Sequence, residues 1–354
     1  MDSVGQWIRQ TRITKGFSLQ RLAESVEPKV TVEELRNFEN GRVIPSRSAL
    51  VEFGRALDVS IEVFMRSPVV DLHLLEYRKP PQITERQCMQ AESAFQDMLE
   101  RYLTIEQILE LDPQVSWRKK LGHAKLMNWE DVEAKAEALR SIWKLGAKPI
   151  PSMCELLEEN GFKILEQDVP KHIDGLACQA EVLNNGWRVV DIVLVSSRVN
   201  IEQKRFTLAH ELAHQIIPST GNPEFPSTKA RERFAGAFLV PKPALLNVTG
   251  TSNRLSTSDE ILSLKRKYGV PASCILMRLG HVGIFAISAV ETAFQTYARS
   301  WLESEPEPLD SSDKWATLEK PSRFKRLVSQ ALTEKLISSD RAKSLLSKLR
   351  WHGS

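Results

Sequence analysis

The first part of the chain repeats hydrophobic positions at helical spacing over short stretches, which predicts four short amphipathic helices. Ser18 and Thr31 are typical N-caps of the second and third of them, and Gly41 is typical of a helix end. Two short helices joined by a turn, with further helices packed behind them, indicate a helix-turn-helix. We therefore expect residues 1–66 to form an all-α bundle whose third helix can enter the major groove of DNA.

The rest of the chain divides by its hydrophobic pattern into three further tracts. Residues 67–128 continue with longer and more polar helical periodicity, so we expect a helical connector there. Residues 129–290 mix helical stretches with β-branched ones such as GWRVVDIVLVSS, and they predict an α+β domain. A polar stretch at 304–315 is typical of a linker, and 315–354 predicts a small helical tail. The expected fold class is α+β and multidomain.

Four residues on or beside the predicted recognition helix are candidate DNA contacts: Arg36, Asn37, Arg42 and Arg47. Residues 1–66 hold ten Arg or Lys against nine Asp or Glu, so a single copy carries only +1 and gains little from counterion release. The helix also opens with Glu33 and Glu34, whose charges oppose phosphate. A bundle used only for dimerisation or protein contact is the alternative interpretation.

One helical segment carries metal chemistry. In QKRFTLAHELAHQII, residues 203–217, His210 and His214 lie one turn apart on one helix face with Glu211 between them. This H-E-x-x-H spacing lets two imidazoles bind one Zn²⁺ while the carboxylate acts as a general base. A polar helix face with two hydrogen-bonded histidines is the alternative.

Two stretches resemble known families. SLQRLAESV, FENG and the following Pro-Ser resemble the Cro/repressor-like (XRE) helix-turn-helix domains over about 60 residues. RFTLAHELAHQII followed by RFAGAFLVP resembles the ImmA/IrrE-type metallopeptidases, and the likeness extends over about 130–285. The resemblance implies a bacterial or phage regulator with an operator-binding head and a zincin-like domain. Some members of such systems are antitoxins encoded beside a toxin.

The resemblance also concerns the third zinc ligand. The family places a glutamate six residues before the Phe of its Phe-Ala pair, and Thr228 stands there in this chain. Glu232 follows one helical turn later, so His210, His214 and Glu232 are the candidate ligands. Zinc held by the two histidines and water, or a site that has lost its metal, are the alternatives.

Composition narrows the class of protein. Forty-eight basic and 45 acidic residues give a net charge of +3, too balanced for a strongly cationic surface. No signal-peptide core and no apolar run of membrane-spanning length are found in the sequence. Cys88, Cys154, Cys178 and Cys274 are widely separated and are expected to be reduced thiols. We therefore expect a cytoplasmic protein.

The leading hypothesis is a DNA-binding transcriptional regulator, with a toxin-antitoxin antitoxin as one form of it. Its zinc metallopeptidase-like domain would sense a ligand or bind a partner. We expect double-stranded operator DNA and a toxin or repressor protein as partners, and a homodimer. One alternative is an active zinc endopeptidase that cleaves a repressor or itself, so the enzymatic status stays open. Another alternative is an interaction protein that sequesters a toxin.

Overall fold

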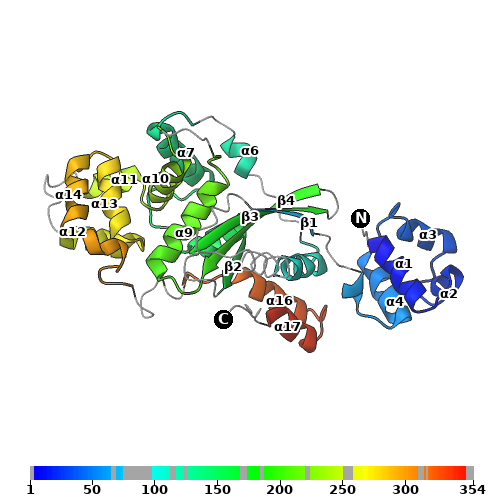
Figure 1. The fold of residues 1–354 in the computed structure, drawn as a ribbon. Helices are drawn as coiled ribbons and strands as arrows, with labels where there is room; N and C mark the ends of the chain where they lie inside the picture. Colours follow the sequence, from blue (N-terminus) through cyan, green and yellow to red (C-terminus); the bar gives the residue numbers. More distant parts are fainter. Residues whose placement is uncertain are drawn as a thin grey trace, which may run out of the picture.

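The computed structural model describes residues 4–64, 69–74, 98–111, 117–122, 126–167, 174–183, 187–219, 224–249, 258–309, 315 and 318–347. It has an N-terminal helical bundle, an α+β domain and two C-terminal helices, as the predicted fold class requires. Figure 1 shows the bundle at one end of the molecule and helices α11–α14 at the other.

The N-terminal bundle consists of four α-helices and one 3-10 turn. They are α1 (Val4–Thr14), α2 (Leu19–Glu24), α3 (Val32–Glu39), α4 (Arg47–Leu57) and η1 (Ile61–Val63). The predicted caps are present: the Ser18 hydroxyl accepts from Arg21 N, and Thr31 and Glu34 form a reciprocal capping box at the start of α3. Leu22, Leu35 and other apolar residues fill the bundle core.

Within the described residues, the sheet has four strands in the order β1-β3-β4-β2. They are β1 (Val69–Leu74), β2 (Lys163–Gln167), β3 (Gly175–Leu183) and β4 (Trp187–Ser196). β3 pairs antiparallel with β1 and β4, while β2 pairs parallel with β4. β1 corrects one expectation, because it lies in the stretch predicted as a helical connector. The alternation in VVDLHL suits a strand, and β3 supplies the backbone partner that this short segment needs.

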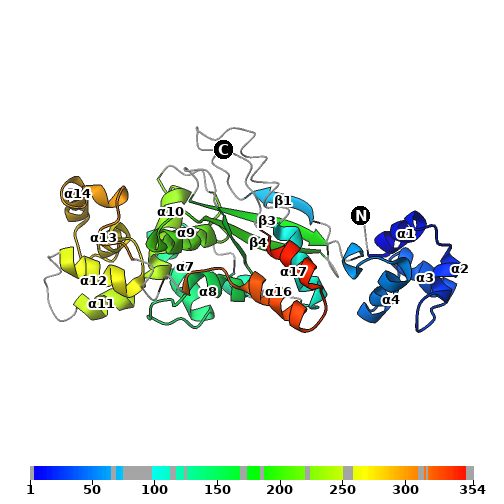
Figure 2. The same cartoon turned by 90° about the horizontal axis from the view of Figure 1, so that it is seen from below.

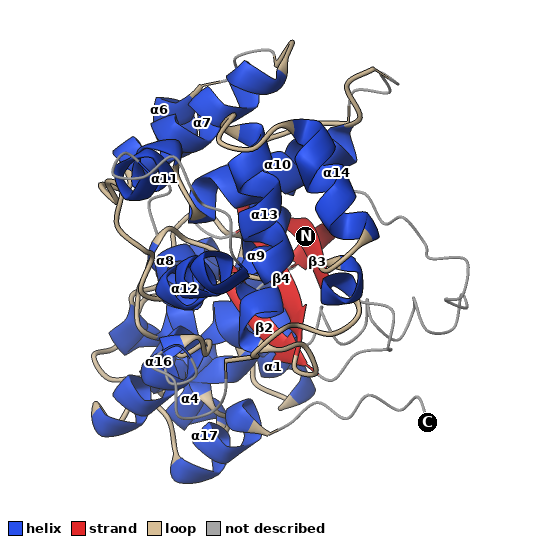
Figure 3. Cartoon of the chain, turned by 90° about the vertical axis from the view of Figure 1, so that its left-hand side faces the viewer, coloured by secondary structure: helices blue, strands red, loops and turns tan. Residues whose placement is uncertain are grey.

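Helices cover the sheet, and Figures 2 and 3 show α9 lying across it. The domain helices are α6 (Trp117–Leu121), α7 (Trp129–Ile142), α8 (Met153–Glu159), α9 (Ile201–His214), α10 (Ser227–Leu239), α11 (Lys242–Thr249), α12 (Ser258–Tyr268), α13 (Ala272–His281), α14 (Ile287–Gln295) and the 3-10 turn η2 (Arg299–Leu302). The tail forms α16 (Arg323–Thr333) and α17 (Ser339–Leu346), the helix pair expected from its pattern.

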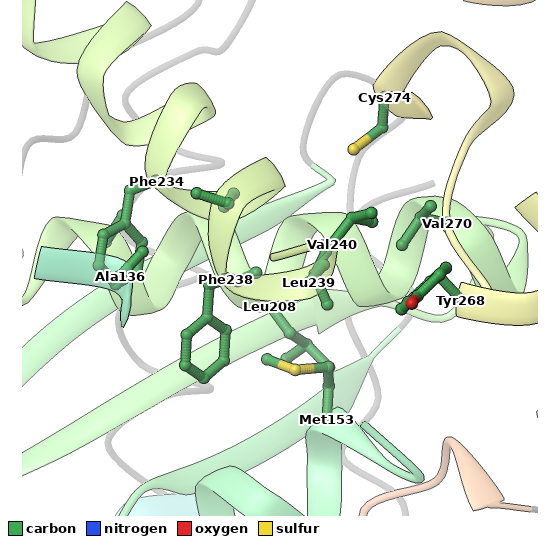
Figure 4. Packing of buried hydrophobic residues seen from close by; sticks show 14 of the residues in the cluster. Ala136, Met153, Leu208, Phe234, Phe238, Leu239, Val240, Tyr268, Val270 and Cys274 are labelled. Carbon is green, nitrogen blue, oxygen red and sulfur yellow. The ribbon is translucent and has the colours of Figure 1, made fainter. Parts of the chain in front are cut away.

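The main core lies between α9, α10 and the helices around them. Figure 4 shows Phe234 and Phe238 of α10, one turn apart, near Leu208 of α9. The two phenyl rings lie nearly parallel, with centroids 5.8 Å apart. Both phenylalanines and Leu208 are fully buried, so α9 is fixed between the sheet and α10.

Buried ion pairs attach the C-terminal part of the chain to this domain. Glu319 accepts from the backbone N–H groups of Met153 and Cys154, at 3.1 and 2.8 Å, and pairs with Arg205 of α9. The stretch predicted as a linker is also attached in its described part, because Leu309 N donates to Glu202 Oε1 at 2.8 Å. Glu305, in the same described part, accepts from the Ala272 N–H at 2.8 Å, so at least one of the charged side chains of this stretch binds the domain.

The described helical residues 98–108 bridge two hydrophobic clusters. Leu99 and Leu103 pack with apolar side chains of the sheet, and Tyr102 and Ile105 belong to a cluster that contains the bundle and tail helices. None of the described helices is long and apolar enough to cross a membrane. Cys154, Cys178 and Cys274 are buried free thiols, and Cys88 lies outside the described residues.

Candidate functional site

Helix α9 is held in a fixed rotation by buried charged contacts along its first half. Its N-cap Asn200 accepts from Gln203 N at 2.8 Å. Glu202 pairs with Lys265 and Arg205 pairs with Glu319, and all four side chains are buried. Because these contacts fix the helix on several sides, they also set the direction of the side chains one and two turns later.

His210, Glu211 and His214 form one group near the end of α9. One possible ligand atom from each of the three residues lies within 4.8 Å of the others. The two imidazole rings have centroids 5.0 Å apart and planes at 71°. Glu211 is buried and both histidines are half-buried. Among the described residues, this is the one group whose composition and spacing could hold a metal ion.

Strand β3 surrounds the Glu211 carboxylate on one side. The backbone N–H of Ala177 donates to it, and Gly175 faces it at the start of the strand. A Cβ at Gly175 would lie 3.2 Å from Glu211 Cγ and 2.3 Å from Thr207 Cγ2, so only glycine allows this approach of strand and helix. Burial raises the pKa of Glu211 to about 8, against the lowering effect of the Ala177 N–H and the nearby Arg231 charge.

The imidazole of His210 has the properties of a metal ligand. Burial, together with the charge of Arg231, lowers the pKa of His210 to about 4, so the ring is neutral at pH 7. Its Nδ1 atom is buried and has no hydrogen-bond partner among the described residues. Two imidazoles beside a carboxylate are a donor set that zinc accepts, and we conclude that these residues fit the metal.

Arg231 of α10 belongs to this surrounding and was missed in the sequence analysis. Its side chain is buried, and its Nε and one terminal nitrogen donate to Ile217 O at 3.0 and 2.9 Å. This bond links α10 to the chain just after the second histidine. An arginine inside an otherwise apolar helix stripe was the available signal, although sequence spacing alone does not say which element it contacts.

The candidate third ligand lies apart from the group. Glu232 is exposed on α10 and is not among the three residues whose ligand atoms lie together. It lines a neighbouring cavity instead. Thr228, one turn earlier on α10, is half-buried.

The four candidate DNA contacts lie on one continuous stretch of the bundle. Arg36 and Asn37 are on α3, Arg42 follows it, and Arg47 begins α4. Arg36 and Arg42 are exposed, while Asn37 and Arg47 are half-buried. The backbone is ordered by the bond from Arg42 N to Asn37 O, at 2.9 Å.

Two acidic residues of α3 are engaged within the bundle. Glu34 accepts from the Thr31 backbone N–H at 2.7 Å, and Glu39 accepts from Arg12 at 2.9 Å. Glu34 therefore starts the helix and Glu39 fixes it against α1. Glu33, in the first turn of α3, is exposed.

Comparison with known protein families finds a match for two parts of the chain. Residues 158–280 match the model of the IrrE N-terminal-like domain, which contains α9 and the His210 group. Residues 8–64 match a helix-turn-helix model. No curated protein and no solved structure matches the chain. Both resemblances seen in the sequence are confirmed, and the chain joins a DNA-binding helix-turn-helix of the XRE type to a metallopeptidase-like domain of the ImmA/IrrE type.

Proposed function

We propose that the protein is a transcriptional regulator that binds double-stranded operator DNA through α3 and senses a ligand or holds a partner protein through its metallopeptidase-like domain. The observation that carries the proposal is that α3, the recognition helix, presents exposed residues. The second domain of the same chain brings His210, Glu211 and His214 together. Arg36, Asn37, Arg42 and Arg47 are the proposed DNA contacts.

The charge balance of the bundle favours binding as a dimer. Glu34 and Glu39 have structural partners, yet the formal charge of residues 1–66 remains +1. Phosphate contacts supply most non-specific affinity, so two bundles on two half-sites bind far better than one. We propose a homodimer on a two-fold symmetric operator, and light scattering of the full chain measures the oligomer directly.

Gel-shift titration with the DNA upstream of the protein's own gene tests the DNA-binding role. Arg36→Ala should weaken binding by about 1–3 kcal/mol if the side chain reads a base. Arg55→Ala is the matched control, because Arg55 is an exposed arginine on α4 that contacts Glu52 at 3.0 Å. Absence of a shift at low salt with intact protein, or equal losses in both variants, would refute this assignment.

We propose that His210 and His214 hold zinc. Glu232 is the candidate third ligand, and because it lies outside their group its side chain would have to turn toward them to bind the ion. Zinc supplies Lewis acidity, which polarises a carbonyl group and acidifies water. Zinc per chain should be one in the natural protein and should fall in His210→Ala. Loss in Glu232→Ala as well identifies the third ligand, while retention there indicates a site of two histidines. Thr228→Glu should then tighten zinc binding, because it returns a carboxylate to the position where related sequences carry one.

A second candidate function is zinc endopeptidase activity on a repressor or on the chain itself. The environment of Glu211 favours it, because burial and the Ala177 N–H of β3 hold this carboxylate beside both histidines. In this role Glu211 accepts a proton from water and returns it to the leaving amine. Glu211→Gln should abolish cleavage and leave the zinc content and circular dichroism spectrum unchanged. Undiminished cleavage in this variant would exclude the role.

We propose an antitoxin as a more specific form of this regulator. It requires a toxin encoded beside this gene that co-purifies with the full chain. If the complex with the toxin persists in His210→Ala, the toxin binds through surface contacts away from the histidines, as the toxin-sequestering alternative expects. Complex formation lost in that variant would place the partner at the metal group.

A further inference from the structure

A cavity of about 590 Å³ lies between α9, α10 and α13. α10 packs against both α9 and α13, and α14 packs against α13. Phe206 of α9 lines the cavity, and it precedes His210 by one helical turn, about 6 Å along the helix axis. Its volume lies within the range of small-molecule sites. The cavity is thus close to His210, but His210, Glu211 and His214 are not among the residues that line it.

Its walls are mainly apolar and are contributed by separate elements. Trp129 of α7, Phe206 of α9, and Met277 and Phe294 of α13 and α14 line it. Their side chains are only partly buried, since the space between them is open. Aromatic and thioether groups on several sides favour a ligand with an apolar body.

Two arginines on one side of the cavity have only one carboxylate between them. Arg278 and Arg233 share a single carboxylate, Glu133 Oε1, which accepts from them at 2.6 and 2.9 Å. Arg278 is 1% exposed, and its second terminal nitrogen has no hydrogen-bond partner among the described residues. A buried guanidinium donor without an acceptor is costly, and an anion in the cavity would satisfy it.

The other polar groups of the lining do not supply that anion. Lys229 interacts electrostatically with Glu232, so these two charges largely offset each other. The Nδ1 atom of His281 is buried and has no partner among the described residues, and the ring is available for a further hydrogen bond. The charged groups of the lining and Glu133 therefore sum to one positive charge, and the His281 ring can make one more hydrogen bond.

We propose that this cavity binds a small organic anion, namely a carboxylic acid with an aromatic or branched apolar body. The carboxylate binds the free donor of Arg278, and the body packs against Trp129, Phe206 and Phe294. This assignment rests on the ligand-sensing part of the proposed function, for which it names the class of ligand, and it does not depend on metal binding or on DNA binding. An uncharged apolar group in the same space would leave Arg278 unsatisfied.

Isothermal titration of the full chain with three probes of one shape tests the proposal. The probes are 4-phenylbutyrate, 4-phenylbutanol and 4-phenylbutylamine, which differ in charge at one end. The acid should bind one site, and the alcohol should bind about 10- to 100-fold more weakly, because it lacks a charge-assisted hydrogen bond. The amine should not bind measurably.

Variants locate the site. Ser273→Trp places a large side chain at a half-buried lining position and should abolish binding, whereas Ser288→Trp, at an exposed position of α14, should not. Arg278→Met should reduce the preference for acid over alcohol, and Glu133 keeps Arg233 as its partner there. If Ser273→Trp fails to fold, Met277→Trp makes the same test from an exposed lining position.

Several outcomes would overturn the proposal. Equal affinity for acid and alcohol would remove the role of Arg278, and equal binding by both tryptophan variants would place the ligand elsewhere. Binding of the acid that disappears in His210→Ala would mean that the carboxylate binds at the metal group instead. Failure of all three probes to bind saturably would show that the cavity is not a site for this class of ligand.

Discussion

Replacing Gly175 by alanine tests how closely β3 must approach the helix that carries the histidines. The added Cβ would lie 2.3 Å from Thr207 Cγ2 and 3.2 Å from Glu211 Oε1. Carbon atoms pack at about 3.5–4.0 Å, so strand and helix must separate by about 1 Å or more. The φ angle of Gly175 is not in the left-handed region, so the clash alone is responsible.

The expected cost of Gly175→Ala is about 1–3 kcal/mol, which is typical of overpacking in a core. Hydrogen exchange of the β3 and α9 amides measures it as a local opening free energy. Exchange there should become about 5- to 150-fold faster, since about 1.4 kcal/mol corresponds to a factor of ten. Amides of the N-terminal bundle should exchange as before.

Thr207→Ser is the matched companion variant, because it removes only the methyl group that the new Cβ would meet. Alone it should cost about 1 kcal/mol or less, the value of one buried methyl group. The double variant should therefore exchange nearly as slowly as Thr207→Ser. If the two costs simply add, or if Gly175→Ala has no effect, the close contact does not hold β3 against α9.

Three further predictions concern the bundle and the tail. Thr31→Ala removes the hydroxyl that accepts from Glu34 N at 3.1 Å, so thermal unfolding should show a loss of about 1 kcal/mol in the bundle. The Thr31 backbone N–H lowers the pKa of Glu34 below 4.5, so this carboxylate stabilises the bundle above that pH and loses its effect as the pH falls through the lower folded value. Glu34→Gln should flatten that part of the stability–pH curve, and an unchanged curve would contradict the assignment. Glu319→Ala leaves Arg205 buried without its carboxylate and should cost about 3–5 kcal/mol in urea unfolding, whereas Lys320→Ala should change stability by less than about 0.5 kcal/mol. Equal effects of the last two variants would refute a stabilising role for the buried pair.

The features that were predicted correctly depend on neighbours within about one helical turn. Ser18 and Thr31 cap helices through bonds to residues three positions later. His210, Glu211 and His214 lie together because helical periodicity alone places i and i+4 on one face. Such local geometry follows from the order of residues, without knowledge of the rest of the fold.

The features that were missed depend on partners far along the chain. Val69–Leu74 becomes a strand because β3, more than a hundred residues later, supplies its hydrogen bonds. The predicted linker is fixed to the domain because Glu202 accepts from Leu309 N across 107 positions. Glu232 lines the cavity between α10 and α13, and helical spacing along α10 alone could not give that orientation.

The buried charges on and around α9 support the proposal that the histidine group binds a cation. Burying an ionised carboxylate destabilises the fold unless a positive charge or several donors compensate it. Glu202 has Lys265 as a direct partner, and Glu319 has Arg205. In the described part of the chain Glu211 has no such salt bridge: it receives one backbone N–H from Ala177 and the field of Arg231, and burial prevails in raising its pKa. Of these three buried acids, Glu211 is the one without a direct cation, and it lies beside the two imidazoles of His210 and His214. A divalent ion bound there would stabilise the carboxylate in its charged form, so the same position that destabilises the metal-free fold strengthens metal binding.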